Sequence, residues 1–272
     1  RIALVFPMLI GLSSCEGPKL ANQNTAITVE EKTPVIINPE GQLTNQKIWY
    51  SGEFYGKSVR GVRSMNDGAH FTTLGSGENG QEINKFSYAT YEKVGTVLSS
   101  NDLKDEDGKS ISIDEYSFNS DETKVLIATE QESIYRRSSK SFYYIYDLKT
   151  KKTSPLSAKK EGKQRLAEIS PAGTHVAFVR DNDLFCKNLE TNKETRVTRN
   201  GELNKIINGA TDWVYEEEFS IHKGFEWNSN GSKIAFLVFD ESKVKEFHLD
   251  YYGKLYPREY RFKYPKAGED NS

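Results

Sequence analysis

The feature that most constrains the fold is a pattern that recurs four times, at intervals of about fifty residues. Each copy has a turn with Asn, Asp or Gly, then a small polar step, then a mainly apolar run. Aligned on Gly68, Glu122, Gly173 and Gly231, the copies are separated by 54, 51 and 58 residues. They read SMNDGAHFTTL (64–74), FNSDETKVLIAT (118–129), ISPAGTHVAFV (169–179) and WNSNGSKIAFLV (227–238). Turns of this chemistry join strands, so each copy predicts a turn followed by a strand.

A second pattern follows the first in three of the four copies. It has the form of a strand, a polar turn and another strand. The three stretches are FSYATYEKVGTVL (86–98), YIYDLKTKKTSPL (144–156) and FCKNLETNKETRVT (185–198). Each repeat therefore holds about four short strands, which is typical of a β-propeller blade. The alternative is an all-β sandwich whose turns coincide by chance, and the number of matches argues against it.

The composition agrees with an all-β fold. Aromatic residues make up 12% of the chain, and such side chains fit a pleated, half-buried surface. The repeats fill the chain from about Gly41 to its end, and the last repeat lacks its second hairpin. We therefore expect an all-β chain that forms the first three to four blades of a β-propeller, and a propeller that continues beyond Ser272.

The N-terminus has the pattern of an export signal. An apolar run from Ile2 to Leu12 is too short to span a membrane, which takes roughly 20 residues. The stretch LSSC, which ends at Cys15, resembles a bacterial lipobox, in which cleavage before the cysteine leaves it free to carry a lipid. The alternative is a plain signal peptide with an incidental cysteine. We expect a signal peptide over residues 1–15 and an exported protein, periplasmic or at the cell surface, held to a membrane by its lipid.

The segment after the predicted signal is polar and aperiodic. Residues 16–40 lack the apolar content that would offset the entropy of ordering, so they predict a flexible tether. The propeller then occupies residues 41–272. Because the chain begins with Arg rather than Met, we expect a few residues to precede it.

Charge and cysteine content exclude several classes of function. The chain has 37 basic and 39 acidic residues, without the basic excess of a nucleic-acid-binding protein. Two cysteines do not make a disulfide framework, and Cys186 has the context of an ordinary strand residue. The sequences GKS at Gly56 and Gly108 lack the earlier glycine of a phosphate-binding loop. We expect neither a cofactor nor a metal.

One acidic stretch, GATDWVYEEEFS (209–220), interrupts the strand pattern between the third and fourth copies. Thr211 or Asp212 can cap the start of a helix, whose first turn favours carboxylates. A helix of one or two turns would then hold Glu217 and Glu218 at its end, projecting from the propeller. Because the glutamates lie among aromatic residues, we expect some of their charge to face a partly dry site.

Two carboxylates presented together can bind a metal, a sugar or an organic cation. The alternating Asp and Asn residues of a calcium loop are absent. Glycosidases need two carboxyl groups roughly 5 to 10 Å apart across a bond, which adjacent residues do not give by themselves. An ammonium group fits best, because its three N–H donors match two carboxylates. The alternative is that the glutamates form salt bridges with basic neighbours.

The same stretch resembles the double-glutamate motif of dipeptidyl peptidase IV and its bacterial relatives, in the prolyl oligopeptidase clan. Further matches extend over everything after the tether. They are VRSMNDGAHFTTL (62–74), IYRRSSKSFYYIYDL (134–148), FVRDNDLF (178–185) and YRFKYPKAGEDNS (260–272).

This resemblance implies an eight-bladed N-terminal propeller packed on an α/β-hydrolase domain, with a possible homodimer. It implies that Glu217 and Glu218 hold the free amino group of a peptide substrate. It also implies an arginine that binds a substrate carbonyl oxygen, which falls on Arg136, with Arg137 the less favoured neighbour. His222, close to the glutamates, could line the site.

The catalytic residues of such an enzyme are not in this sequence. No G-x-S-x-G nucleophile motif occurs, so we expect the Ser-Asp-His triad beyond Ser272 and no peptidase activity from this chain alone. The first hypothesis is the substrate-recognition part of an exported serine exopeptidase that releases X-Pro or X-Ala dipeptides. The second is a non-catalytic propeller lipoprotein that binds peptides or proteins at the cell surface. A propeller glycosidase ranks below both.

Overall fold

The computed structural model describes residues 41–56, 58–78 and 80–272. The chain divides into two compact units, residues 1–57 and residues 58–272. In the first unit the described residues contain one π-helical turn, η1 (Gln46–Tyr50), which has no buried residue. The predicted signal peptide, the lipid-bearing Cys15 and the tether over residues 16–40 lie outside the described residues.

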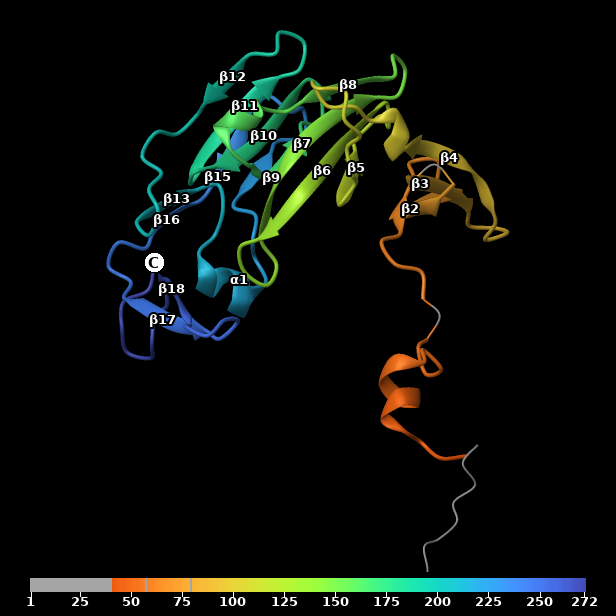
Figure 1. The fold of residues 1–272 in the computed structure, drawn as a ribbon. Helices are drawn as coiled ribbons and strands as arrows, with labels where there is room; N and C mark the ends of the chain where they lie inside the picture. The colour runs from red at the N-terminus through yellow and green to blue at the C-terminus, as the bar shows by residue number, and fades with distance from the viewer. Residues whose placement is uncertain (1–40, 57, 79) are drawn as a thin grey trace, which may run out of the picture. The chain divides into compact units, whose positions relative to one another are not determined.

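The second unit contains three four-stranded antiparallel sheets in chain order (Figure 1). The first consists of β1 (Arg63–Ser64), β2 (His70–Gly77), β3 (Gly80–Ser87) and β4 (Lys93–Ser99). The second consists of β5 (Glu115–Phe118), β6 (Lys124–Ser133), β7 (Ser139–Asp147) and β8 (Lys152–Pro155). The third consists of β9 (Arg165–Ile169), β10 (His175–Arg180), β11 (Asp183–Asn188) and β12 (Glu194–Arg196).

Every strand in these sheets pairs with the strand next to it in the chain, which is the meander of a propeller blade. Short 3₁₀ helices, η2 (Ser100–Asp102) and η3 (Lys159–Glu161), lie in the connections between sheets. The predicted all-β fold with one four-stranded sheet per repeat is therefore confirmed for the first three repeats. The number of blades in the whole propeller stays a prediction.

The turns that aligned the repeats are equivalent in the structure. Gly68, Glu122, Gly173 and Gly231 all have a left-handed backbone, with φ of 66°, 54°, 69° and 69°. In each turn the backbone N–H of this residue donates to the carbonyl three residues earlier. Glycine adopts this conformation without strain, which explains its presence in three of the four copies. The alignment made on sequence alone is confirmed residue by residue.

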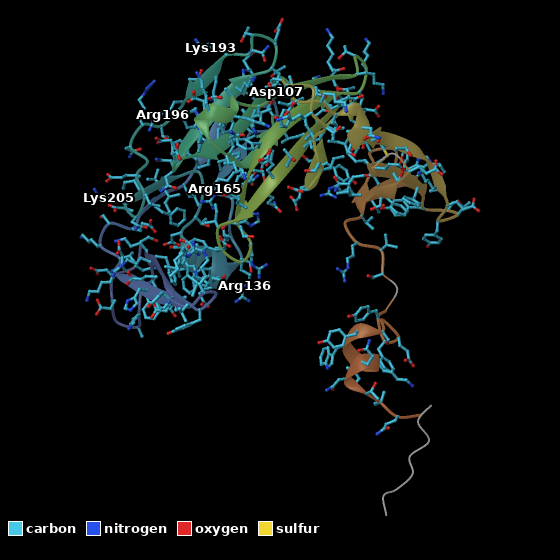
Figure 2. All side chains as sticks on the ribbon, in the orientation of Figure 1. Asp107, Arg136, Arg165, Lys193, Arg196 and Lys205 are labelled. Atoms are coloured by element: carbon cyan, nitrogen blue, oxygen red, sulfur yellow. The ribbon has the colours of Figure 1, made fainter. Side chains whose placement is uncertain are left out.

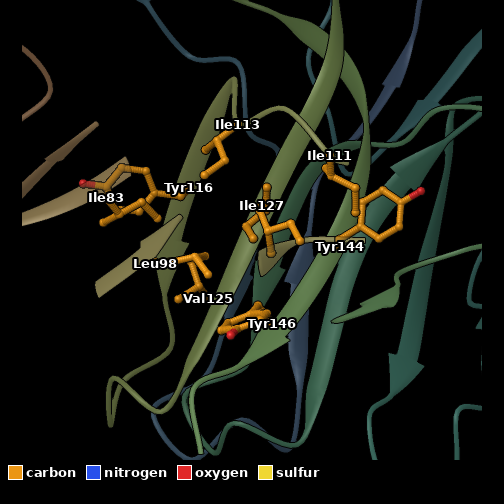
Figure 3. Close-up of a cluster of buried hydrophobic side chains, with 10 residues drawn as sticks. Ile83, Leu98, Ile111, Ile113, Tyr116, Val125, Ile127, Tyr144 and Tyr146 are labelled. Atoms are coloured by element: carbon orange, nitrogen blue, oxygen red, sulfur yellow. The ribbon is translucent and has the colours of Figure 1, made fainter. Parts of the chain in front are cut away.

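The first two sheets pack through one apolar cluster, shown in Figure 3. It includes Ile83 and Leu98 from the first sheet and Val125, Ile127 and Tyr144 from the second, all of them buried. Successive residues of a strand point to opposite faces of the sheet. Val125 and Ile127 therefore point into this cluster, and Leu126 points to the other face of the sheet. This alternation is why β6 is apolar at every position from Val125 to Ala128.

The other face of the second sheet packs on the third sheet in the same way. Leu126 and Ile145 meet Val176, Phe178 and Phe185 in a second cluster. The alternate residues of β10, Ala177 and Val179, face a third cluster instead, together with residues that follow the third sheet. Each middle sheet is thus buried on both faces, and the apolar runs after each turn fill the interfaces between blades.

The fourth repeat has a different construction. Its paired strands are β13 (Ile206–Asn208) with β16 (Val238–Asp240), and β14 (Phe225–Trp227) with β15 (Ile234–Phe236). The helix α1 (Trp213–Phe219) is inserted between β13 and β14, and a hairpin of β17 (Glu246–Tyr251) and β18 (Arg258–Lys263) follows β16. Within the residues that the structure describes, no helix is long and apolar enough to cross a membrane.

Candidate functional site: the glutamate helix and the β6–β7 loop

The helix α1 lies in the connection between two strands of the fourth repeat, β13 and β14. A bridge between Ala210 and Lys223 closes its base, so the chain leaves the sheet and returns to the same place. Asp212 caps the helix, because its Oδ1 accepts the backbone N–H of Tyr215 at 3.0 Å. Of the two predicted caps, Asp212 is thus the one used. At the other end Ser220 has a left-handed backbone, with φ of 58°, which stops the helix after two turns.

Aromatic contacts fix the direction in which the helix faces. The Tyr215 ring packs edge-on against Phe239 of β16 at 4.8 Å and joins the third apolar cluster. On the other side the Trp213 ring lies 4.5 Å from Tyr264 and 5.8 Å from Phe262 of β18. The helix is therefore held between the fourth repeat and the β17–β18 hairpin.

The three consecutive glutamates have three different environments. Glu216 is completely buried, the side chain of Glu217 is 14% exposed, and Glu218 is exposed. Neighbours on a helix project about 100° apart, so one helix cannot place all three on the same side. The prediction that the acidic stretch faces a partly dry place therefore fits Glu216 and Glu217, whereas Glu218 projects outward.

Arg136 lies in the loop of residues 134–138 that joins β6 to β7, and it meets the helix (Figure 2). Its Nε is 3.0 Å from Oε2 of Glu217, while its own side chain is 74% exposed. In the part of the chain that the structure describes, Arg136 makes no other ion pair and Glu218 makes none. The structure thus brings together two of the predicted site residues, Arg136 and Glu217, with Glu218 next to them.

Arg137, the less favoured neighbour, contacts the helix differently. Its backbone N–H, not its guanidinium, donates to Glu216 Oε1 at 2.7 Å. The expected salt bridging of the glutamates by basic side chains applies to Glu217 through Arg136. Glu216 instead accepts backbone N–H groups.

Two hollows border Arg136. One has a volume of about 540 Å³ and is lined by Arg136, Arg137, Glu168, His222 and Lys223, among others. His222, predicted as a residue that could line the site, therefore lies in the wall next to Arg136. Lys223 is 2.6 Å from Glu168 and 2.8 Å from Glu226, so its charge is balanced by two carboxylates.

The second hollow, of about 1380 Å³, lies between the helix and the β17–β18 hairpin. Arg136 and Glu217 lie in its wall, which also contains four further charged residues and seven aromatic ones. The aromatic residues are Tyr135, Trp213, Phe247, Tyr251, Tyr260, Phe262 and Tyr264. An ammonium group that bound here would meet carboxylate oxygen on one side and ring faces on the other, both of which attract cations.

Sequence reasoning missed the β17–β18 hairpin. Its signal is the alternation in EFHLDY and REYRFK, two stretches separated by YGKLYP with its Gly and Pro. The fourth repeat was expected to lack a second hairpin, and this one indeed pairs only with itself and not with the blade. It supplies most of the aromatic wall beside Glu217.

Other candidate chemistry is sparse. Among residues 41–56, 58–78 and 80–272, no three His, Cys, Asp or Glu side chains are grouped as they would be around a metal ion. Cys186 is a free, half-buried thiol on β11, and burial raises its pKa.

Comparisons with known proteins show the family of this chain. Residues 119–272 match the family described as the dipeptidyl peptidase IV (DPP IV) N-terminal region. A probable dipeptidyl-aminopeptidase B of Chaetomium globosum is 38% identical over 162 residues, which are 54% of this chain and 17% of that protein. The probable dipeptidyl-aminopeptidase B of Emericella nidulans is 36% identical over 193 residues, 66% of this chain and 21% of that protein.

Among solved structures, the crystal structure of Porphyromonas gingivalis dipeptidyl peptidase 4 is similar with a TM-score of 0.73 and 40% identity. The match covers 84% of this chain and 32% of that one. A putative dipeptidyl aminopeptidase IV from Bacteroides ovatus shares the fold, with a TM-score of 0.52 at 20% identity. The chain thus spans about a fifth of the length of the curated relatives and about a third of the first of these structures.

Proposed function

Since this chain belongs to the family of dipeptidyl peptidase IV N-terminal regions, we propose that it is the substrate-recognition part of an exported dipeptidyl peptidase. In this proposal the complete protein releases X-Pro or X-Ala dipeptides from peptides that have a free N-terminus. A serine nucleophile and its partners belong to an α/β-hydrolase domain outside this chain.

The observation that most supports the proposal is the pairing of Arg136 with Glu217 at 3.0 Å, with the carboxylate of Glu218 one residue further along. A peptide α-ammonium has three N–H donors, and two adjacent carboxylates can accept them. Charge-assisted hydrogen bonds of this kind are roughly twice as strong as neutral ones. Glu217 and Glu218 would therefore bind the ammonium together.

Arg136 has a second task in this proposal. Its Nε faces Glu217, and its two terminal nitrogens make no hydrogen bond within the described part of the chain. A guanidinium presents five donors in a planar fork, so these nitrogens can donate to the first carbonyl oxygen of the peptide. Arg136 would then orient Glu217 on one side and the substrate on the other.

Fixing the ammonium explains why the products would be dipeptides. The α-amino group has an ordinary pKa near 7.7–8.0, so much of it is charged at neutral pH. Contact with two carboxylates favours its charged form further. With that end held, the length of two residues decides which peptide bond reaches the nucleophile. The binding site would therefore determine the length of the released product.

The test uses the complete protein and a chromogenic Gly-Pro substrate. Glu217→Gln, Glu218→Gln and Arg136→Gln should each lower kcat/KM by tens to thousands of times, because removing one partner of a charge pair that the bound peptide covers costs about 2–5 kcal/mol. Arg137→Gln is the matched control and should change kcat/KM little. The N-acetylated substrate should resist cleavage by the unaltered protein.

Unchanged kcat/KM in both glutamate variants would overturn the proposal. Equal turnover of the free and acetylated substrates would indicate an endopeptidase instead. Binding of free peptides without any hydrolysis by the complete protein would favour the non-catalytic surface lipoprotein.

We also propose that the protein is anchored to a membrane through lipid on Cys15 and forms a homodimer. The motif LSSC supports the first part. Exposed apolar side chains between β17 and β18 support the second, since Tyr252, Leu255 and Tyr256 are 81%, 91% and 82% exposed. The intact mass of the native protein tests for acyl chains, and sedimentation of the detergent-solubilised protein tests for the dimer. An unmodified, monomeric protein would exclude both.

A further inference from the structure

The first of the three glutamates has no place in the ammonium site, yet it is the most buried. Glu216 is completely buried, and a buried carboxylate is unfavourable unless other groups replace its lost hydration. The side chain therefore needs partners inside the protein, and these lie on the loop that contains Arg136.

Two adjacent backbone groups of that loop bind one oxygen of Glu216. The N–H groups of Arg137 and Ser138 donate to Oε1 at 2.7 and 2.9 Å, although 79 and 78 residues separate donor and acceptor. Ser138 is itself buried, and its carbonyl accepts the N–H of Ile134 at 2.8 Å, which closes the loop. Glu216 thus binds the backbone immediately after Arg136 to the helix that bears Glu217.

The ion pair between Arg136 and Glu217 cannot by itself do this. Arg136 is largely exposed, and exposed ion pairs contribute little to holding two segments together. Buried hydrogen bonds to an ionised acceptor are stronger and are not screened by solvent. The bonds to Glu216 are therefore what fixes the distance between the loop and the helix, and the exposed pair follows from it.

The other oxygen of Glu216 has no such partner, and its charge interacts with that of a buried arginine. Oε2 is buried and has no hydrogen-bond partner, and the same is true of Nε and Nη2 of Arg165, the first residue of β9. Burial lowers the pKa of the Arg165 guanidinium, and the negative charge of Glu216 is the main influence that opposes this. The two buried charges balance each other without a direct hydrogen bond.

We propose that Glu216 is a positioning residue, which holds Arg136 against Glu217, and that Arg165 balances its buried charge. This inference rests on the proposed function, because its consequence is the placement of Arg136 in an ammonium and carbonyl site. Glu216 touches no substrate in this scheme. It acts only through the loop of residues 134–138.

The test measures kcat and KM of the complete protein for the Gly-Pro substrate. Glu216→Gln keeps the shape but removes the charge, and should lower kcat/KM by about 10- to 100-fold, the loss expected for hydrogen bonds to a charged acceptor. The change should lie mainly in KM, because binding of the substrate's amino end is what is disturbed. Glu190→Gln, at an exposed glutamate on the turn between β11 and β12, is the matched control and should change neither constant.

A second pair of measurements separates positioning from general damage. Arg165→Met should also raise KM, and the double variant with Glu216→Gln should lose less than the product of the two single losses, because neither charge is then left unbalanced. Inactivation by a small fluorophosphonate, which needs the nucleophile but no amino group, should stay within about twofold in all variants. A matching fall in that rate would mean a merely structural role and would overturn the inference.

The outcomes distinguish this inference from the function on which it rests. If Glu217→Gln loses activity and Glu216→Gln keeps its KM, the positioning role is wrong and the ammonium site stands. If Glu217→Gln keeps full activity, the ammonium site itself is wrong. Strictly multiplicative effects of Glu216→Gln and Arg165→Met would exclude Arg165 as the balancing charge.

Discussion

The three regular sheets and the two insertions of the fourth repeat are built on opposite principles. The sheets meet through dry apolar interfaces in which alternate residues of one strand face two neighbours, such as Leu126 and Ile127 of β6. The insertions, α1 and the β17–β18 hairpin, meet the rest of the unit through carboxylates, an arginine and aromatic rings. The apolar interfaces and the proposed recognition site are therefore located in different parts of the unit.

The difference between the apolar interfaces and the polar insertions follows from the physical chemistry of each kind of contact. Apolar burial is non-directional and adds up over area, so it suits a repeated interface that only has to be filled. A site that recognises an ammonium must present charge, which the interior tolerates only with partners of defined geometry. Placing the proposed site on an insertion keeps these costs out of the blade interfaces.

The largest expected effect comes from replacing one phenylalanine in the regular sheets and one in the insertions. Phe178 of β10 is completely buried and stacks on Phe185, whereas Phe219 at the end of α1 is 62% exposed. Phe178→Ala should reduce the free energy of unfolding by about 3–5 kcal/mol, as expected for a buried aromatic residue. Phe219→Ala should change it by about 0.5 kcal/mol or less. Denaturant unfolding of the complete protein measures both, and equal losses would contradict the separation.

A second effect, smaller and dependent on pH, should come from the place where the insertions meet. Glu241, which follows β16, is buried, and burial together with the nearby carboxylate of Asp212 raises its pKa to about 7, while Lys263 lowers it. Between pH 4.5, its ordinary pKa, and pH 7, the folded protein holds a proton that the unfolded chain has lost. Unfolding then releases a proton, so the stability should fall as the pH rises through this window.

Melting curves of the complete protein between pH 4.5 and 8 measure this effect. Glu241→Gln should flatten the decline, because glutamine does not titrate, and should gain most relative to the unaltered protein above pH 7. Glu190→Gln, an exposed glutamate on the turn between β11 and β12, is the matched control for the loss of one charge. A decline that persists in Glu241→Gln would place its origin elsewhere.

The smallest expected effect is a difference in stability between two of the turns that begin the repeats. Gly68 and Gly231 share a left-handed backbone, but a methyl group at Gly68 meets nothing within 4 Å, whereas one at Gly231 comes within 3.1–3.3 Å of Ser170 and Ala172. Gly68→Ala should cost about 1 kcal/mol for the backbone alone. Gly231→Ala should cost more, because it also disturbs the contact with the preceding turn. Chemical denaturation gives the two values, and equal costs would mean that the turns do not support one another.

Local patterns made much of this structure predictable. The alternation of apolar residues and the turn chemistry at Gly68, Glu122 and Gly173 are short-range signals, and they located the sheets correctly. The cap at Asp212 and the helix behind it are equally local. The β17–β18 hairpin was missed because its strands pair only with each other and break the period of the repeat.

The sequence by itself determined that three glutamates occur together on a short capped helix, and that a basic loop precedes β7. Only the tertiary structure decided which glutamate is buried. That depends on how Tyr215 of the helix packs on Phe239 of β16, a contact between residues that are far apart in the sequence. Rotation of the helix by one residue, about 100°, would exchange the buried and exposed carboxylates without changing the sequence pattern. The interaction between the charges of Arg165 and Glu216 has the same cause, since long-range packing, not local propensity, buries both groups in one unit.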